Sequence, residues 1–170
     1  VRPIGFSRGT YAQPEGLTLV AGSAIDPAKK ALAHARAFGY AESKPENIPA
    51  SVAAFTELPR ASSYRSELDL AWQNGEGDIV SFVGLWFDPV SRLAILEPVG
   101  TIPAYRRMNL AERLIDEGAK RVASLGATAL YVGSSQDFYK AIGFEVAALQ
   151  DVWEYRKEPE HSLYSREGLK

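Results

Sequence analysis

The chain has 170 residues, of which 46% are hydrophobic and 24% charged, and its formal net charge is −2. This length suits one domain with a sizeable core, and the balanced charge argues against nucleic acid as a partner. No cysteine is present, which excludes a disulfide, a thiolate metal ligand and a cysteine nucleophile and fits a cytoplasmic protein. No apolar run reaches the roughly 18 to 20 residues that cross a bilayer, so we expect neither membrane insertion nor secretion.

The N-terminal part begins with a polar segment. Residues 1–16 are rich in Gly, Pro and polar side chains, and we expect an arm there, ahead of a short strand over 17–22. Asp26 followed by Pro27 is typical of a helix N-cap and first helical position, so a helix is predicted to begin there. It is predicted to end at Gly39. A short helix over 51–58 is predicted to follow.

From residue 68 the pattern changes to strand-like runs. Three of them, 68–73, 78–87 and 92–99, are separated by the turn signals Asn-Gly-Glu-Gly and Asp-Pro-Val-Ser. Short turns of this kind join antiparallel strands. The three runs are therefore predicted to form an antiparallel meander.

The clearest helix of the sequence follows the meander. Apolar residues recur at helical spacing from Leu110 to Leu125, and Gly126 is placed as a C-terminal cap, so we predict a helix over 109–125. A strand over 128–133 comes next. A strand, a helix and a strand in this order form a crossover, which makes the two strands parallel within an otherwise antiparallel sheet.

Charged residues of that helix occur at the spacing of ion pairs along a helix. Asp116 with Lys120 and Glu117 with Arg121 are i,i+4 pairs, and together with Glu112 they predict a face exposed to solvent.

The C-terminal part is predicted to complete the sheet. A short helix over 134–143 is followed by two strand-like runs, 144–149 and 151–156. We therefore expect one domain over 17–158 and a tail over 159–170.

Two short motifs carry a resemblance to a known family. The first is Arg106-Arg107-Met108-Asn109-Leu110-Ala111, and the second is Tyr139 ahead of the pair Gly143-Phe144. Over about residues 17 to 156 the chain resembles the GNAT superfamily of acyl-CoA-dependent N-acyltransferases, whose first motif is Arg or Gln, two residues, Gly, one residue, then Gly or Ala. The resemblance implies an α/β (α+β) fold: a mixed, mostly antiparallel central sheet with one splayed parallel strand pair and flanking helices.

The first motif also has a physical interpretation of its own. A helix N-terminus offers unpaired N–H groups and partial positive charge, so residues 106–111 are suited to a pyrophosphate, and Arg106 and Arg107 add cationic donors. Asn109 replaces the family's glycine, tolerates left-handed dihedral angles and is a good N-cap. The alternative is that the arginines are merely exposed and Asn109 merely caps the helix.

Pro98 interrupts the end of the third meander strand, which suits a bulge or a point where two parallel strands part. The resemblance implies that the pantetheine arm of acetyl-CoA enters this gap and pairs with the backbone near Val99, Gly100 and Thr101, where an N–H could polarise the thioester carbonyl. Glu97 is a candidate general base for the amine, directly or through water, and a surface carboxylate is the equally open alternative.

Tyr139 matches the family position that protonates the departing thiolate. A phenol can donate a proton to a thiolate if the local field assists, so the role is chemically reasonable. The alternative is a core tyrosine that packs against Phe138 and Phe144. The two histidines, His34 and His161, are isolated, so no metal site is expected.

The sequence thus favours an N-acetyltransferase that moves an acetyl group from acetyl-CoA, as cosubstrate, to a primary amine of a small molecule or peptide by direct attack. We expect the acceptor to be selected by the loops over 40–66 and the meander turns, which offer Glu57, Tyr64, Arg65 and Trp86. A non-catalytic acyl-CoA-binding module, or one half of a tandem protein, is the alternative, and a structural domain without cofactor is a third. A homodimer is left open.

Overall fold

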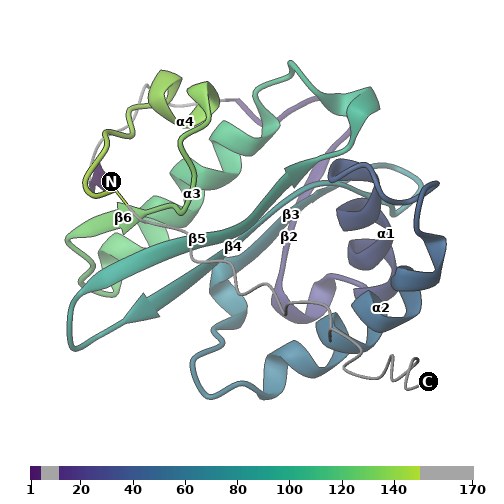
Figure 1. The fold of residues 1–170 in the computed structure, drawn as a ribbon, viewed down its shortest axis with the longest axis horizontal. Helices are drawn as coiled ribbons and strands as arrows, with labels where there is room; N and C mark the ends of the chain where they lie inside the picture. Colours follow the sequence, from purple (N-terminus) through teal and green to yellow (C-terminus); the bar gives the residue numbers. More distant parts are fainter. Residues whose placement is uncertain (5–11, 150–170) are drawn as a thin grey trace, which may run out of the picture.

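The computed structural model describes residues 1–4 and 12–149. Across these residues one sheet of six strands has the order β1-β6-β5-β4-β3-β2 (Figure 1). The strands are β1 (Arg2–Pro3), β2 (Thr18–Ala21), β3 (Asp69–Gln73), β4 (Ile79–Asp88), β5 (Leu93–Thr101) and β6 (Ala129–Tyr131). Neighbouring strands are antiparallel except β5 and β6, which are parallel. The predicted mixed sheet and its meander are therefore confirmed.

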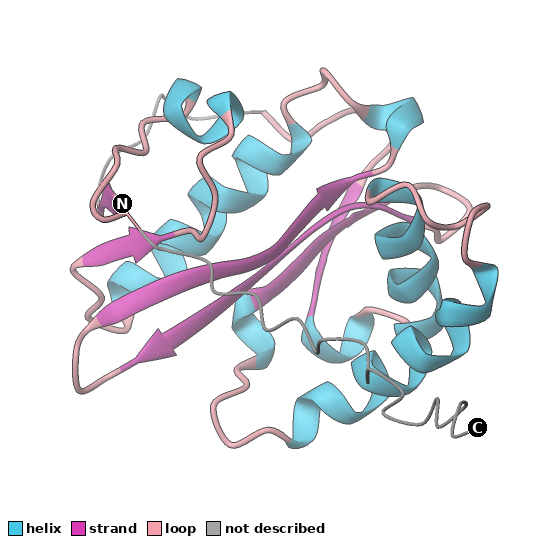
Figure 2. Ribbon diagram, viewed as in Figure 1, coloured by secondary structure: helices cyan, strands magenta, loops and turns pink. Residues whose placement is uncertain are grey.

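Helices flank both faces of the sheet (Figure 2). The α-helices are α1 (Pro27–Ala37), α2 (Ile48–Glu57), α3 (Leu110–Ser124) and α4 (Asp137–Ala141), and one-turn 3-10 helices cover Gly22–Ala24, Pro45–Asn47, Leu58–Arg60, Ser66–Leu68 and Pro103–Tyr105. A Cβ on Gly118 of α3 would meet the Leu85 side chain, whereas a Cβ on Gly100 would meet Ala37 of α1. The two helices thus pack on opposite faces of the β4–β5 pair. None of the helices in the described ranges is long and apolar enough to span a membrane.

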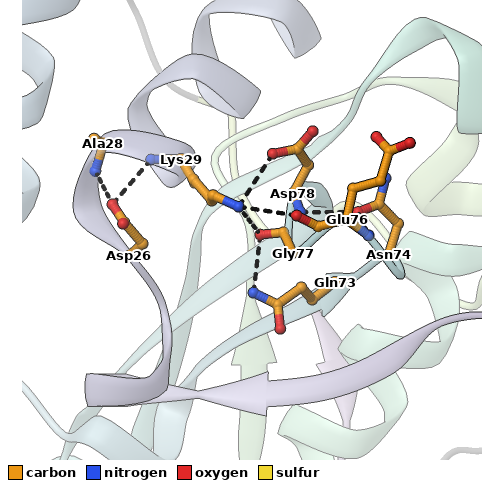
Figure 3. Close-up of polar contacts among 8 residues, drawn as sticks. All are labelled: Asp26, Ala28, Lys29, Gln73, Asn74, Glu76, Gly77 and Asp78. Carbon is orange, nitrogen blue, oxygen red and sulfur yellow. Dashed lines mark hydrogen bonds and ion pairs between the residues drawn. The ribbon is translucent and has the colours of Figure 1, made fainter.

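Helix α1 is fixed to the sheet through its first turn (Figure 3). The Asp26 carboxylate accepts hydrogen bonds from the N–H groups of Ala28 and Lys29, at 2.8 and 3.2 Å, which confirms the predicted N-cap. The Lys29 ammonium then reaches the β3–β4 turn, where it donates to the Gly77 carbonyl at 2.8 Å and lies 3.3 Å from an Asp78 carboxylate oxygen. The hairpin turn therefore positions α1 over the strands that form the site.

The register of β4 against β5 contains the bulge that Pro98 predicted. Val83 pairs with Val99 and Leu85 with Leu96, so Gly84 alone faces both Glu97 and Pro98. Parallel pairing of β5 with β6 covers Leu93 to Ile95 and ends before the bulge. Beyond that point the two strands part, as the sequence predicted.

The first residues of the chain take part in the sheet, although the sequence analysis placed them in an arm. β1 pairs with β6, Arg2 opposite Leu130. The Arg2 side chain is 1% exposed, and its Nη1 lies 2.8 Å from a carboxylate oxygen of Asp116 on α3. The prediction of a fully solvent-exposed charged face on α3 is therefore wrong at Asp116 and Glu112, which are both buried, while the predicted pair Glu117–Arg121 forms at 2.9 Å.

The predicted strand over 144–149 is not formed. These residues have no regular secondary structure, and Val146 and Leu149 are exposed. The reason is that β6 already has β5 on one side and β1 on the other, so neither of its edges is available to a further strand. The strand predicted over 151–156 lies outside the described residues.

Candidate functional site

A cavity of about 910 Å³ opens where β5 and β6 part. Its wall comes from four segments that are distant in sequence: the C-terminal turn of α1, the second half of β5, the loop into α3 with the first turn of that helix, and the segment from the end of β6 into α4. A volume of this order is typical of a small-molecule site. The bulge at Pro98 and the start of α3 therefore face a common space.

Most of the residues predicted for the site line this cavity. They are Glu97, Val99, Gly100, Thr101, Arg106, Arg107, Asn109, Leu110, Ala111 and Tyr139. Met108 belongs to the first motif but is not part of the wall, and its side chain is 47% exposed. The structure thus brings both motifs and the bulge together at one cavity.

The edge of β5 offers backbone groups to the cavity. The Ile102 N–H donates to the Val80 carbonyl at 3.0 Å, so this pair and the pair Gly100–Phe82 are the hydrogen-bonded pairs of the antiparallel ladder. By alternation, the N–H and carbonyl of Val99 and Thr101 point away from β4. They face the gap left by β6, which is the geometry needed to bind an extended amide-containing chain.

The start of α3 has the backbone conformation of a glycine motif. Asn109 lies in the left-handed region, with φ 55° and ψ 23°, and Arg107 has φ 66°. The first helical hydrogen bond runs from the Arg113 N–H to the Asn109 carbonyl at 3.1 Å, so the N–H groups of Leu110 and Ala111 precede the helical ladder. Asn109 is the N-cap residue of α3, as predicted, but its side chain makes no capping hydrogen bond.

The two arginines of the motif lie in different environments. Arg106 donates through Nε to the Thr101 carbonyl at 3.2 Å and through Nη2 to the Ala37 carbonyl at 2.9 Å, and so it ties the end of α1 to the end of β5. Arg107 is exposed. Both belong to the cavity wall, and together with the open N–H groups of α3 they give this end of the cavity a positive potential that fits a pyrophosphate.

Tyr139, the first residue of the second motif, lies on α4. Its ring is 8% exposed and packs edge-on against Phe138 and Phe144, with centroids 5.1 and 5.6 Å away. The packing predicted for a core tyrosine is confirmed, and the ring also lines the cavity, while its catalytic role stays a prediction. Burial raises the pKa of the Tyr139 phenol, so the group is protonated at neutral pH but is a weaker acid than an exposed tyrosine.

Glu97 lies at the bulge and borders two spaces. It lines the large cavity, and it also lines a crevice of about 20 Å³, room for about one water molecule, with Tyr64, Arg65 and Trp86. The Trp86 indole N–H donates to the Glu97 carbonyl at 3.1 Å. Three of the four residues predicted to select the acceptor are thus beside Glu97, whereas Glu57 pairs with Arg60 away from the crevice.

Sequence reasoning missed His34, which also lines the large cavity. Its Nδ1 lies 2.7 Å from the Tyr40 hydroxyl, and its ring stacks on Phe82 at 5.7 Å. Burial lowers the pKa of the His34 imidazole, and the Lys30 ammonium lowers it further. The only signal in the sequence is that His34 falls one helical turn before Phe38, a spacing that does not show which space the ring faces.

Comparison with known proteins agrees with this geometry. The model of the acetyltransferase (GNAT) family matches residues 37–144, which include the bulge, both motifs and α1's last residue. The chain belongs to this family. A search of curated proteins found no match.

Solved structures share the fold at low sequence identity. An acetyltransferase from Trypanosoma brucei is 19% identical, with a TM-score of 0.60 over 82% of this chain and 99% of that one. A GNAT family N-acetyltransferase from Escherichia coli, solved in complex with CoA, is 21% identical, with a TM-score of 0.61 over 81% and 74%. An aminoglycoside 6'-N-acetyltransferase from Acinetobacter baumannii is 15% identical, with a TM-score of 0.60 over 85% and 99%.

Proposed function

We propose that the protein is an acetyl-CoA-dependent N-acetyltransferase that acetylates a primary amine of a small molecule or peptide by direct attack. The observation that carries the proposal is the single cavity that joins the open first turn of α3, the free edge of β5 and the Tyr139 side chain. Membership of the acetyltransferase family supports the same chemistry.

The anionic end of acetyl-CoA is proposed to bind at α3. The N–H groups of Leu110 and Ala111 and the positive end of the helix would hold the pyrophosphate, with the exposed Arg107 as a cationic donor. Arg106 contributes charge while its hydrogen bonds keep α1 and β5 in place. Met108 contributes its backbone position within the motif rather than a contact of its side chain.

The pantetheine arm is proposed to run along the free edge of β5. Its amide groups would pair with the outward-facing N–H and carbonyl of Val99 and with the N–H of Thr101, whose carbonyl accepts from Arg106. Gly100 lets Phe82 and Ala37 pack closely against this strand. The thioester then lies near the bulge, where the Val99 N–H can stabilise negative charge on the carbonyl oxygen.

The transfer itself needs two proton movements. The amine must lose a proton so that its lone pair can attack the thioester carbonyl carbon, and the sulfur must gain one as the C–S bond breaks. Tyr139 is proposed to supply the proton to sulfur. Glu97 is the carboxylate we propose for the amine, either as proton acceptor, directly or through water, or as the charge that attracts the ammonium form.

Calorimetric titration with acetyl-CoA and with CoA, followed by thiol release in the presence of an amine library, tests the proposal. We expect binding of both ligands and release of CoA with at least one amine. No binding at millimolar ligand would refute every CoA-dependent function. Binding without transfer to any amine would instead favour the non-catalytic acyl-CoA-binding module.

The role of Tyr139 is tested by Tyr139→Phe, which keeps the ring and removes the donor. Turnover should fall about 10²-fold, the effect typical of losing a general acid, while the affinity for acetyl-CoA stays nearly the same. Tyr131→Phe is the matched control, because Tyr131 lies on β6 outside the cavity wall. Equal turnover of the two variants would remove Tyr139 from the mechanism.

A further inference from the structure

His34 is surrounded by aromatic rings on the side of the sheet covered by α1 and α2. Its ring centroid lies 4.5 Å from Phe38, 5.6 Å from Phe55, 5.7 Å from Phe82 and 5.8 Å from Tyr40. Phe82 in turn lies opposite Gly100 in the ladder. The imidazole is therefore one layer of side chains from the stretch of β5 where the thioester is proposed to bind.

A chain of polar contacts links this imidazole through Tyr40 to Ser51 on α2. The Asn47 carbonyl can only accept, so the Ser51 hydroxyl at 3.2 Å donates to it. Ser51 Oγ is then free to accept from the Tyr40 hydroxyl at 3.5 Å, and when Tyr40 donates in that direction its oxygen accepts from Nδ1 of His34 at 2.7 Å. With its proton on Nδ1, a neutral imidazole carries its lone pair on Nε2.

The geometry also leaves Nε2 accessible. Tyr40, which holds Nδ1, is not in the cavity wall, whereas His34 is. Among residues 1–4 and 12–149 the structure gives no hydrogen bond to Nε2. His34 thus lines the cavity while Tyr40 engages its Nδ1, so Nε2 is the ring nitrogen left for a ligand.

The charges around His34 favour the neutral ring. Lys30, one turn earlier on α1, is a cation that acts on His34 and is itself paired with Asp69. The neighbours from α2 and β4, Phe55 and Phe82, are uncharged, and the titratable group from the loop after α1 is Tyr40. Since burial and Lys30 both lower the pKa of His34, the base form is present at neutral pH.

We propose that Nε2 of His34 takes the proton from the acceptor amine through a water molecule, that Tyr40 and Ser51 are positioning residues that fix its tautomer, and that Glu97 attracts the ammonium group without taking its proton. This inference rests on the proposed acetyltransferase function and assigns a residue to the step that function leaves open.

Every proton in the acetyl-transfer step has a donor and an acceptor. The ammonium gives one proton to Nε2 through the water molecule, and the freed lone pair forms the C–N bond to the thioester carbon. The C–S bond breaks, and sulfur takes the Tyr139 proton. The surplus proton on the new amide nitrogen returns to the Tyr139 oxygen, directly or through water. The imidazolium of His34 releases its proton to water as the products leave, so one proton is released per turnover.

The tautomer can be tested without any activity. Nitrogen-15 chemical shifts of His34 at neutral pH, assigned by comparison with His34→Gln, should show a protonated Nδ1 and an unprotonated Nε2. Tyr40→Phe and Ser51→Ala should each shift the population toward the other tautomer. Ser43→Ala is the control, because Ser43 likewise donates to the carbonyl four residues earlier, at 3.3 Å, but lies outside the chain of bonds. A wild-type ring protonated on Nε2 would overturn the proposal.

Kinetics test the base itself. With an amine found in the library screen, His34→Gln should lower kcat about 10²-fold and remove the acidic limb of the kcat/KM profile, which in the wild type should lie below pH 6.5. Tyr40→Phe should lower kcat less and shift that limb. Glu97→Gln should mainly raise KM for the amine.

Different results would refute the acetyltransferase function and the role of His34. Wild-type protein that binds no acetyl-CoA refutes the function. Wild-type protein that transfers acetyl groups with the same pH profile in His34→Gln refutes only the role of His34, and a lost acidic limb in Glu97→Gln instead assigns the base to Glu97.

Discussion

Asn109 shows how one residue can replace a glycine at a binding turn. Its dihedral angles, φ 55° and ψ 23°, lie in the region that glycine adopts freely and that asparagine tolerates better than most residues. The side chain makes no hydrogen bond to the helix end. What this position requires is therefore a backbone conformation, and the identity of the side chain is secondary.

We expect Asn109→Gly to leave affinity for acetyl-CoA unchanged or to tighten it, because glycine reproduces the turn and removes a side chain from the cavity wall. Asn109→Val should be destabilising by roughly 1–2 kcal/mol, since a β-branched residue is strained at positive φ. Calorimetric titration and thermal unfolding of the two variants measure these effects. A marked loss of affinity in Asn109→Gly would show that the amide side chain itself contacts the ligand.

At the scale of elements, the bulge in β5 determines where the strands part. Gly84 faces Glu97 and Pro98, and a Cβ there would lie 2.7 Å from the Glu97 carbonyl oxygen and 3.2 Å from Pro98 Cδ. The bulge is therefore packed directly against the backbone of β4. Any side chain at position 84 must move the segment that carries the proposed oxyanion donor.

Gly84→Ala should lower stability by about 1–3 kcal/mol, the usual effect of overpacking, and should reduce turnover more than acetyl-CoA binding at α3. Gly75→Ala is the control, because a Cβ there would meet nothing within 4 Å. Thermal unfolding and steady-state kinetics compare the two. Wild-type turnover in Gly84→Ala would mean that the bulge position does not matter for the reaction.

The elements that the sequence predicted well are those with local signals. Asp26 and Pro27 mark the start of α1, and Pro98 marks the bulge, because each acts on its own backbone. The strand over 144–149 was predicted from an equally local pattern and is absent, because a strand also needs a free edge. The position of His34 also depends on non-local packing. Its contact with Tyr40, and the contact of Tyr40 with Ser51, form only when α1 and α2 pack together.

At the scale of the whole molecule, the N-terminal residues connect the sheet to α3. Arg2 is buried against Asp116, and its Nη1 also lies 3.4 Å from the Ile142 carbonyl, which it donates to. Burial raises the pKa of Asp116, and Arg2 opposes that rise. The pair therefore joins β1, α3 and the turn after α4, a contact that no local pattern in the sequence could predict.

Arg2→Ala should lower the free energy of unfolding by about 3–5 kcal/mol at neutral pH, because it leaves the Asp116 carboxylate buried without its cation. The pKa of Asp116 is raised in the folded state, so protonation favours that state, and the deficit should shrink as the pH falls toward 4. Arg60→Ala, at an exposed pair with Glu57, should change stability by less than about 0.5 kcal/mol. Denaturant titrations at several pH values measure both.

The pairing of β1 with β6 also limits the order in which the strands can pair while the chain is being synthesised. Arg2 of β1 lies opposite Leu130 of β6, so this edge of the sheet cannot form until the chain has been synthesised beyond Leu130, and the contact of the Arg2 side chain with the Ile142 carbonyl forms later still. A nascent chain that ends after the meander would still expose the edge of β5, which pairs with β6 in the finished protein. The same exposed backbone that is proposed to receive pantetheine in the folded enzyme would thus be, during translation, the part of the sheet most open to pairing with another chain.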